Sequence, residues 1–386
     1  MKKRAILCLA MTLIFVITAV SGCNVPSGAD ADSFVFADAG GNEKSVSAEE
    51  ILSYTPSRPD AVGDYMKQKL SGNELYIYCA VSYAVDNCFA QIKVPEKYGS
   101  EDINTYLKAI TFYSCDSPFL EHNYSDDGSF RLTESTYLNK TLYSFTLPRN
   151  DSSFTEEKQQ AYQKAGEIVG SMPKEYDEEQ KAIFLYDYVV NNVNYITDVT
   201  AYDYSTVPIY DALLSETHET ICDGFADTLM MLFNMADIES FAVEGVNNKN
   251  TGHVVVCAKL GNSYFYFDPT NDSPIRKNGF KSGFYFALSD KQLSEYFNAE
   301  EDFAGILPEC PKSRIGAHAD VVALGDDLTT INEAVMIFNR DGAINVYFSD
   351  IVSDSTKENF GRRLATAIGT PIITTRINGV LGYANQ

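Results

Sequence analysis

The chain is poor in several residue types that functional sites often use. It has no tryptophan, only four histidines, and 30 basic residues against 53 acidic ones. The resulting net charge of −23 at pH 7 repels phosphate backbones, which argues against nucleic acid as a partner. A hydrophobic fraction of 45% nevertheless indicates a globular protein rather than a disordered one.

The cysteines lack the patterns that bind metals. There is no Cys-x-x-Cys pair and no zinc-type spacing with histidine, so we expect neither a structural metal nor a cofactor. Beyond the N-terminal segment the cysteines are Cys79, Cys88, Cys115, Cys222, Cys257 and Cys310. One interpretation is a disulfide such as Cys79–Cys88. We favour the other, in which most of these cysteines are small buried apolar residues.

Only the N-terminus carries a long apolar run. A basic Met1–Arg4 precedes apolar residues 5–20, which are too few to span a bilayer comfortably. The run ends in Val20-Ser21-Gly22-Cys23, which resembles the lipobox of bacterial lipoproteins. We therefore interpret residues 1–22 as a lipoprotein signal peptide and residues 23–45 as a lipidated Cys23 with a flexible tether. An ordinary secretory signal with a chance cysteine is the alternative. The expected location is the extracytoplasmic face of the cell membrane, with contact through the lipid alone.

The rest of the chain divides by composition and turn signals. We predict an N-terminal α/β domain (46–150), a central domain (151–310) and a small C-terminal α/β domain (311–386). Strand-type residues over Glu74–Val81 and Cys88–Val94 predict two strands in the first of these. Neither flanking domain shows a catalytic constellation, and we interpret His122 and His318 as loop residues.

A strongly helical pattern begins at Cys222. Its apolar face consists of Phe225, Leu229, Leu232, Phe233 and Ala236. Cys222 is therefore predicted at a helix N-terminus, where the helix dipole and free backbone N–H groups favour a reactive thiolate. Gly224 in the first turn would let another backbone or a substrate approach closely. The alternative is that Cys222 is simply a small buried residue.

A β-hairpin is predicted after this helix. Two strand-type runs, 253–260 and 263–268, flank the turn Gly261-Asn262. If these two residues form the turn, Leu260 pairs with Ser263; a turn one residue earlier is the other possible register.

Both registers place His253 and Asp268 on the same face, because side chains alternate along a strand. The two residues are diagonal neighbours in the first register and directly opposed in the second. Placed over the helix N-terminus, this face would supply an imidazole to Cys222 and a carboxylate to orient that imidazole.

These segments resemble the transglutaminase-like superfamily, whose fold is related to papain-like cysteine peptidases. The matching residues are Cys222-Asp223-Gly224-Phe225-Ala226, Gly252-His253, Tyr264-Phe265-Tyr266-Phe267-Asp268-Pro269-Thr270 and, upstream, Tyr210-Asp211-Ala212-Leu213. The resemblance spans roughly residues 177–274. It implies an α+β fold, with helices packed on an antiparallel sheet. It also implies a Cys-His-Asp triad in which Cys222 is the nucleophile, His253 the general base and acid, and Asp268 the orienting residue.

Some positions depart from the family pattern. Thr220-Ile221 replaces the common Gly-Val, and the residues after His253 are valines where many relatives have Ala-Trp-Asn. The backbone N–H of Cys222 is one expected oxyanion donor, and Tyr210 is a candidate for another. His218 lies close before Cys222, but no strand geometry supplies it with an orienting carboxylate, so it is the less favoured base.

The resemblance implies a surface-anchored cysteine enzyme that acts on peptide or glutamine amide bonds through a Cys222 thioester. We expect a protein or peptide substrate, which includes cell-wall-associated ones. Hydrolysis is slightly favoured over transamidation, because water is always present as an acyl acceptor whereas an amine acceptor needs a dedicated binding site. A non-catalytic surface lipoprotein that uses this fold for binding or as a scaffold is the alternative, motivated by the absent tryptophan and the two flanking domains.

Overall fold

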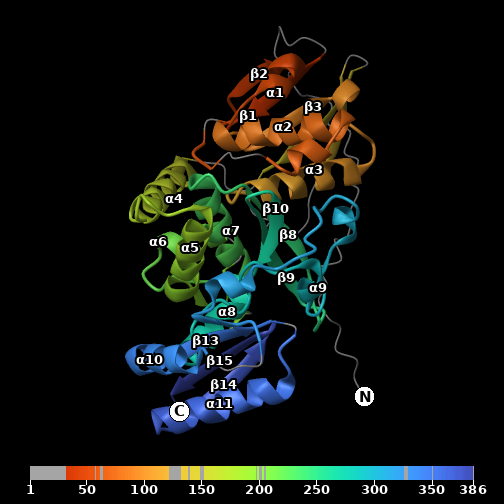
Figure 1. The fold of residues 1–386 in the computed structure, drawn as a ribbon. Helices are drawn as coiled ribbons and strands as arrows, with labels where there is room; N and C mark the ends of the chain where they lie inside the picture. The colour runs from red at the N-terminus through yellow and green to blue at the C-terminus, as the bar shows by residue number, and fades with distance from the viewer. Residues whose placement is uncertain are drawn as a thin grey trace, which may run out of the picture.

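The computed structural model describes residues 32–56, 58–60, 64–120, 132–137, 140–147, 152–196, 198–199, 202–203, 206–325, 329–349 and 351–385. The expected signal peptide, Cys23 and His122 lie outside these residues. The fold is α+β, with helices packed on mostly antiparallel sheets. Figure 1 shows the N-terminal sheet at one end, a central sheet with its helices in the middle, and the C-terminal sheet at the other end. Within the described ranges, no helix has the length and apolar character needed to cross a membrane.

The N-terminal part is a five-stranded antiparallel sheet with helices on it. Its strands run in the order β2-β1-β3-β5-β4. The elements are β1 (Ser33–Ala37), β2 (Glu43–Ser47), α1 (Ala48–Ser53), α2 (Gly72–Asp86), β3 (Gln91–Pro95), α3 (Ile103–Asp116), β4 (Thr133–Tyr137) and β5 (Lys140–Thr146).

The prediction of a flexible tether over residues 23–45 is wrong for residues 33–45. These residues form β1 and most of β2, and β1 also pairs with β3 inside the sheet. Phe34 and Phe36 are fully buried, and the Phe36 ring lies 4.9 Å from that of Tyr83. Their burial outweighs the polar, glycine-rich surroundings that suggested a tether.

The prediction of a strand over Glu74–Val81 is also wrong, because these residues belong to α2. Residues Ile77–Val85 are all buried, and α2 packs against α3 and β3. Tyrosine and valine favour strands only weakly, and an apolar run this long suits a buried helix better. The second predicted strand, Cys88–Val94, corresponds to β3 (Gln91–Pro95), which begins three residues later and ends one residue later.

The central part holds the helix and hairpin predicted from the sequence. Its four-stranded antiparallel sheet has the order β10-β9-β8-β11. The elements are α4 (Ser152–Gly170), α5 (Glu178–Asn192), β6 (Asn194–Tyr195), α6 (Pro208–Leu214), β7 (Glu219–Thr220), α7 (Cys222–Met235), β8 (Ser240–Asn247), β9 (Gly252–Leu260), β10 (Ser263–Phe267), α8 (Pro269–Lys277), α9 (Asp290–Leu293) and β11 (Phe297–Ala299). Leu260 pairs with Ser263, and Gly261 has a positive φ of 63°, so the first of the two hairpin registers is confirmed.

Both faces of the central sheet are covered. On one face α7 packs, with the Phe233 and Phe267 rings 5.2 Å apart. On the other, Tyr65 of the N-terminal part stacks on Phe241 at 4.2 Å and contacts Tyr264. The two parts therefore share one continuous hydrophobic core.

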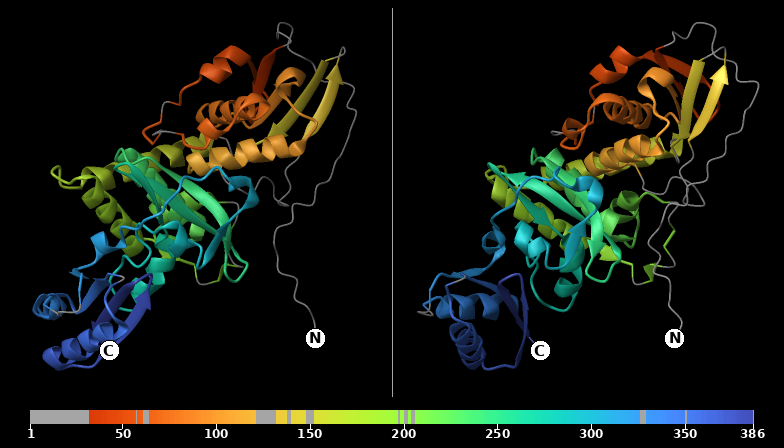
Figure 2. Two further views of the ribbon diagram at one scale, coloured as in Figure 1. Left: turned by 45° about the vertical axis from the view of Figure 1, so that its right-hand side comes forward. Right: turned by 90° about the vertical axis from the view of Figure 1, so that its right-hand side faces the viewer.

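The C-terminal part is a second, smaller α/β unit. It contains β12 (Val321–Ala323), α10 (Ile331–Asp341), β13 (Ala343–Phe348), α11 (Asp354–Ile368), β14 (Ile372–Ile377) and β15 (Val380–Asn385). Its sheet has the order β12-β13-β15-β14, and only β12 and β13 are parallel. A separate hydrophobic cluster fills it, and both views of Figure 2 place it at the end opposite the N-terminal sheet. The three domain boundaries proposed from the sequence remain predictions.

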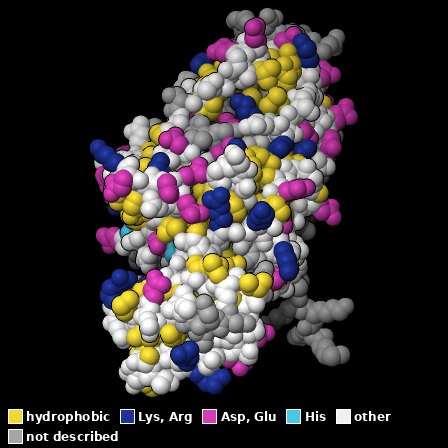
Figure 3. Space-filling view, in the orientation of Figure 1, with side chains coloured by type: hydrophobic (Ala, Val, Ile, Leu, Met, Phe, Trp, Pro, Cys, Tyr) yellow, Lys and Arg dark blue, Asp and Glu magenta, His cyan; other side chains and the backbone are white. Residues whose placement is uncertain are grey.

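The charged side chains on the face shown in Figure 3 are spread out. Acidic side chains are spread over the face in Figure 3, with lysines and arginines between them. The negative net charge is therefore not gathered into one patch on this face.

Candidate active site

Cys222 is the first residue of α7. Ile221 before it has an extended backbone and no capping side chain, and the Cys222 side chain is half-buried. Its Sγ donates a hydrogen bond to Oδ2 of Asp223 over 3.3 Å. The cysteine therefore lies at a helix N-terminus as predicted, next to a carboxylate whose role the sequence did not suggest.

The surroundings of the Cys222 thiol favour its protonated form. Burial raises the pKa of Cys222 well above its usual value, and the charge and hydrogen bond of Asp223 raise it further. The Asp268 carboxylate acts in the same direction, while the backbone N–H of Asp223 opposes these effects. Burial and the neighbouring carboxylates thus oppose the thiolate that the helix N-terminus was expected to favour.

Gly224 permits a close approach, and the group that approaches is the chain itself. A Cβ at this position would lie 2.2 Å from Oγ1 of Thr220 and 2.6 Å from the carbonyl oxygen of Pro208. Oγ1 of Thr220 also donates to that carbonyl over 3.1 Å. The glycine lets α6, β7 and the start of α7 pack tightly, which fixes the backbone around Cys222.

His253 and Asp268 are in direct contact. Nε2 of His253, on β9, donates to Oδ2 of Asp268, just after β10, over 2.8 Å, and both side chains are buried. Burial alone would lower the pKa of His253, but the charge and hydrogen bond of Asp268, together with the charge of Asp223, raise it. The hairpin register therefore produces the predicted imidazole–carboxylate pair.

Asp268 is held by the first turn of α8 as well as by His253. Its Oδ1 accepts from the backbone N–H of Asn271 over 3.0 Å, and its Oδ2 accepts from Nδ2 of Asn271 over 2.7 Å. Asp268 thus acts as the N-cap of α8, with Pro269 in the first helical position. Sequence reasoning missed Asn271, although an aspartate followed by proline is a recognisable helix start.

A second buried carboxylate supports this arrangement. Tyr186, on α5, donates to Oδ2 of Asp272 over 2.7 Å and to the backbone oxygen of Asp268 over 3.3 Å. Asp272 also accepts from the backbone N–H groups of Gly283 and Tyr285. The carbonyl of Tyr285 in turn accepts from the N–H of Asp268 over 3.1 Å. The orienting residue is therefore fixed through both its side chain and its backbone.

His253 and Asp268 are hydrogen-bonded to each other, whereas the link between Cys222 and this pair is electrostatic. The Cys222 hydrogen bond goes to Asp223 and not to His253. Asp223 nevertheless influences the pKa of both Cys222 and His253, and Asp268 influences that of Cys222, so the four side chains form one electrostatic group.

The other candidates lie in different surroundings. Nδ1 of His218 contacts the carbonyl oxygen of Ala212 at 2.9 Å, so a carbonyl rather than a carboxylate orients this histidine. Tyr210 packs against Phe119, with ring centroids 5.9 Å apart. Nε2 of His318 contacts Asp187 at 2.8 Å, so this histidine is buried against α5 rather than lying free in a loop.

The structure also bears on the disulfide and metal sites considered from the sequence. The six described cysteines are not joined in disulfides, and Cys79, which could have paired with Cys88, is buried in α2. Among the residues with described side chains, no group of three His, Cys, Asp or Glu is arranged to hold a metal ion.

Comparisons with known proteins give partial structural likenesses. No family model and no curated protein matches the sequence. A candidate cysteine protease from Cytophaga hutchinsonii is similar over 39% of this chain and 65% of its own, at 16% identity and a TM-score of 0.25. A TGase is similar over 37% and 44%, at 17% identity and a TM-score of 0.25. A candidate protease from Parabacteroides distasonis is similar over 36% and 35%, at 14% identity and a TM-score of 0.23.

The solved neighbours thus include a transglutaminase and a cysteine protease, the two groups that the sequence resemblance named. This chain spans less than two-thirds of each of the three structures. At these TM-scores the likenesses identify neighbours and add no argument about chemistry, which depends on the residues described above.

Proposed function

We propose that this chain is a cysteine enzyme of transglutaminase-like type that acts on peptide or glutamine amide bonds. The observation that supports this most is the buried hydrogen bond between His253 and Asp268, next to a helix that begins at Cys222. Burying a histidine–aspartate pair is costly unless the pair is used or well compensated, and such pairs gather at functional sites.

The proposed first half-reaction uses a neutral imidazole. Because Nε2 of His253 donates to Asp268, Nδ1 is the nitrogen that can accept the Cys222 proton. The thiolate then attacks the amide carbonyl carbon, and the backbone N–H of Cys222 donates to the resulting oxyanion. The imidazolium returns its proton to the leaving nitrogen, so the C–N bond breaks and a thioester on Cys222 remains.

In the second half-reaction a nucleophile attacks the thioester. His253 takes a proton from water or from an amine and returns it to the Cys222 sulfur as the thioester opens. Water gives hydrolysis, and an amine gives a new amide. We favour hydrolysis, since water needs no dedicated site.

The proposal extends to the location of the enzyme. The lipobox-like junction at Cys23 supports a lipoprotein anchored at the extracytoplasmic face of the membrane. Protein or peptide substrates outside the cell, including those bound to the cell wall, would then be within reach.

The test is to incubate residues 24–386 with glutamine-containing peptides, with and without a fluorescent primary amine, and to measure masses. Cleavage, deamidation and amine incorporation give different mass changes. Cys222→Ala should reduce turnover by about 10³-fold or more, and His253→Ala should do the same. Cys88→Ser changes the other half-buried thiol and should leave turnover unchanged. Full activity in Cys222→Ala would overturn the proposal.

A non-catalytic binding protein is the second candidate. The observation in its favour is that the Cys222 thiol is hydrogen-bonded to Asp223 rather than to His253, in surroundings that raise the pKa of the thiol. This candidate predicts no mass change with any peptide, together with alkylation of Cys222 that His253→Ala does not slow.

A further inference from the structure

The contact between Cys222 and Asp223 has a direct consequence for the chemistry. A thiol can donate to a carboxylate only while it carries its proton. A thiolate in the same place would put two negative charges at the observed separation of 3.3 Å, in a partly buried site. The thiol therefore cannot ionise without cost while Sγ stays beside Asp223.

The cysteine side chain has one rotatable bond, so Sγ can occupy only a few staggered positions. One of these is the observed position against Oδ2 of Asp223. Transfer of the proton to Nδ1 of His253 needs a position nearer the imidazole. The rotation that brings Sγ to the imidazole therefore also breaks the hydrogen bond to Asp223.

On the basis of the proposed function, we infer that Asp223 is a positioning residue that keeps Cys222 in a resting, protonated state until Sγ turns towards His253. Its carboxylate faces both partners of the proton transfer. It opposes a thiolate on Cys222 and favours an imidazolium on His253, so it raises the proton affinity of both groups, and its hydrogen bond is to the thiol. We expect the resting enzyme to hold a neutral thiol rather than a preformed ion pair.

The charged groups around these two residues come from several elements. On α7, Asp223 acts on Cys222 and His253, and Asp227, one turn further on, faces Asp223. After β10, Asp268 acts on both Cys222 and His253. On β8, Glu244 faces Asp227.

Asp227 offers a matched control on the same helix. Burial, Asp223 and Glu244 raise its pKa well above the usual value. Asp227→Asn makes the same chemical change one turn away from the Cys222 contact, whereas Asp223→Asn removes the carboxylate that contacts the thiol and retains an oxygen that can accept from it. The double variant removes any charge that Asp227 gains once Asp223 is replaced.

The experiment measures alkylation of the mature chain by iodoacetamide between pH 5 and 10, with peptide mass spectrometry to read Cys222 and Cys88 separately. Asp223→Asn should lower the midpoint of the Cys222 profile by about one pH unit or more, which raises its rate near pH 7.5 about tenfold. The Cys88 profile in the same samples should not move, and Asp227→Asn should resemble the unaltered chain.

A second readout concerns the histidine. With a substrate that the enzyme converts, the acidic side of the kcat/KM profile should also move to lower pH in Asp223→Asn. The reason is that this variant removes one of the charges that raise the pKa of His253. A purely structural role for Asp223 would change stability without moving both profiles in the same direction.

An unmoved Cys222 midpoint in Asp223→Asn, or an equal shift in Asp227→Asn, would overturn the inference. Alkylation needs no substrate, so this outcome differs from failure of the proposed function. That failure would appear as absent turnover in every variant, whatever the alkylation profiles show.

Discussion

Single residues at the site determine how activity should depend on pH. The pKa of the Cys222 thiol is raised by burial and by Asp223, and the pKa of His253 is raised by Asp268 and Asp223 against the effect of burial. The imidazole must be unprotonated to accept the thiol proton. The proton affinity of His253 therefore controls the acidic side of the rate profile.

We predict that kcat/KM rises with pH and that the midpoint of the rise lies above 6.5, the usual pKa of histidine. Asp268→Asn should lower that midpoint, because it removes the charge with the largest raising effect, and should also reduce the maximal rate. The measurement is kcat/KM between pH 5 and 9. A midpoint at or below 6.5 in the unaltered enzyme would contradict this prediction.

Asn271 gives a second prediction at this scale. It donates two hydrogen bonds to the Asp268 carboxylate, which also accepts from His253, so Asn271→Ala should leave His253 less well oriented. We expect kcat to fall about 10- to 100-fold with little change in KM, since a small misplacement affects the chemical step. Asn278→Ala, an exposed position just beyond the end of the same helix, is the control. Equal kcat losses in both variants would show that α8 stability rather than orientation is responsible.

At the level of elements, the start of α7 depends on its contact with α6 and β7. Gly224→Ala would place a Cβ 2.2 Å from Oγ1 of Thr220 and 2.6 Å from a backbone carbonyl. We predict a loss of about 1–3 kcal/mol in the free energy of unfolding, measured by urea denaturation. Gly166→Ala on α4 is the matched control, since the nearest atom there lies at an ordinary 3.9 Å and alanine favours helix. Gly224→Ala as stable as the unaltered chain would show that this contact can relax.

The elements also show what the sequence could predict. The sequence left two registers for the β9–β10 hairpin, and the structure has the one with Gly261-Asn262 as the turn, which fixes every pair beyond it. The start of α7 at Cys222 followed from a clear helical periodicity. Both signals are local, and together they brought His253 and Asp268 into contact.

The errors and omissions came from contacts between distant segments. α2 is helical because its neighbours bury it on all sides, which the residue types alone do not reveal. Likewise, β1 is a strand because it pairs with β3, which lies far along the chain. The protonated state of Cys222 depends on burial and on the rotamer that meets Asp223, and neither follows from position at a helix N-terminus.

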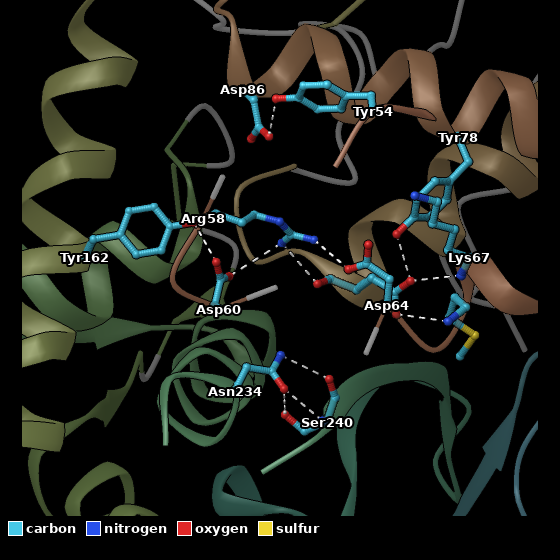
Figure 4. A network of polar contacts seen from close by, with 12 residues as sticks. Tyr54, Arg58, Asp60, Asp64, Lys67, Tyr78, Asp86, Tyr162, Asn234 and Ser240 are labelled. Atoms are coloured by element: carbon cyan, nitrogen blue, oxygen red, sulfur yellow. Dashed lines mark hydrogen bonds and ion pairs between the residues drawn. The ribbon is translucent and has the colours of Figure 1, made fainter. Parts of the chain in front are cut away.

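At the scale of the whole molecule, a buried polar network connects the N-terminal part to α4 (Figure 4). Arg58 forms ion pairs with Asp60 at 3.5 Å and Asp64 at 3.0 Å, and Tyr162 of α4 donates to Asp60 over 2.7 Å. Close by, Asp116 accepts hydrogen bonds from Tyr78 and from two backbone N–H groups. Such a network is costly to bury, so its protonation should affect stability.

Asp116 makes this testable. Burial and the charge of Asp64 raise its pKa to about 7 from an ordinary 3.8. Between these values the folded state binds the proton more tightly than the unfolded state, so this contribution to stability is present below pH 4 and is lost as pH rises to about 7. Asp272, whose burial raises its pKa to about 6, adds to the same trend.

We therefore predict that Asp116→Asn flattens the dependence of stability on pH. The fall in the free energy of unfolding between pH 5 and 8 should shrink by about 2 kcal/mol, measured by urea denaturation at several pH values. Asp237→Asn, at an exposed position after α7, should leave the slope unchanged. A slope that is the same in Asp116→Asn and the unaltered chain would contradict the assignment.

The stacking of Tyr65 on Phe241 limits how far this protein can be shortened. A version trimmed to begin at α4 would keep every residue proposed for catalysis, but it would expose the rings of Phe241 and Tyr264 to water. That surface would favour self-association over a soluble monomer. The N-terminal part, residues 32–147, therefore keeps this surface covered, and efforts to express a shorter version should retain it.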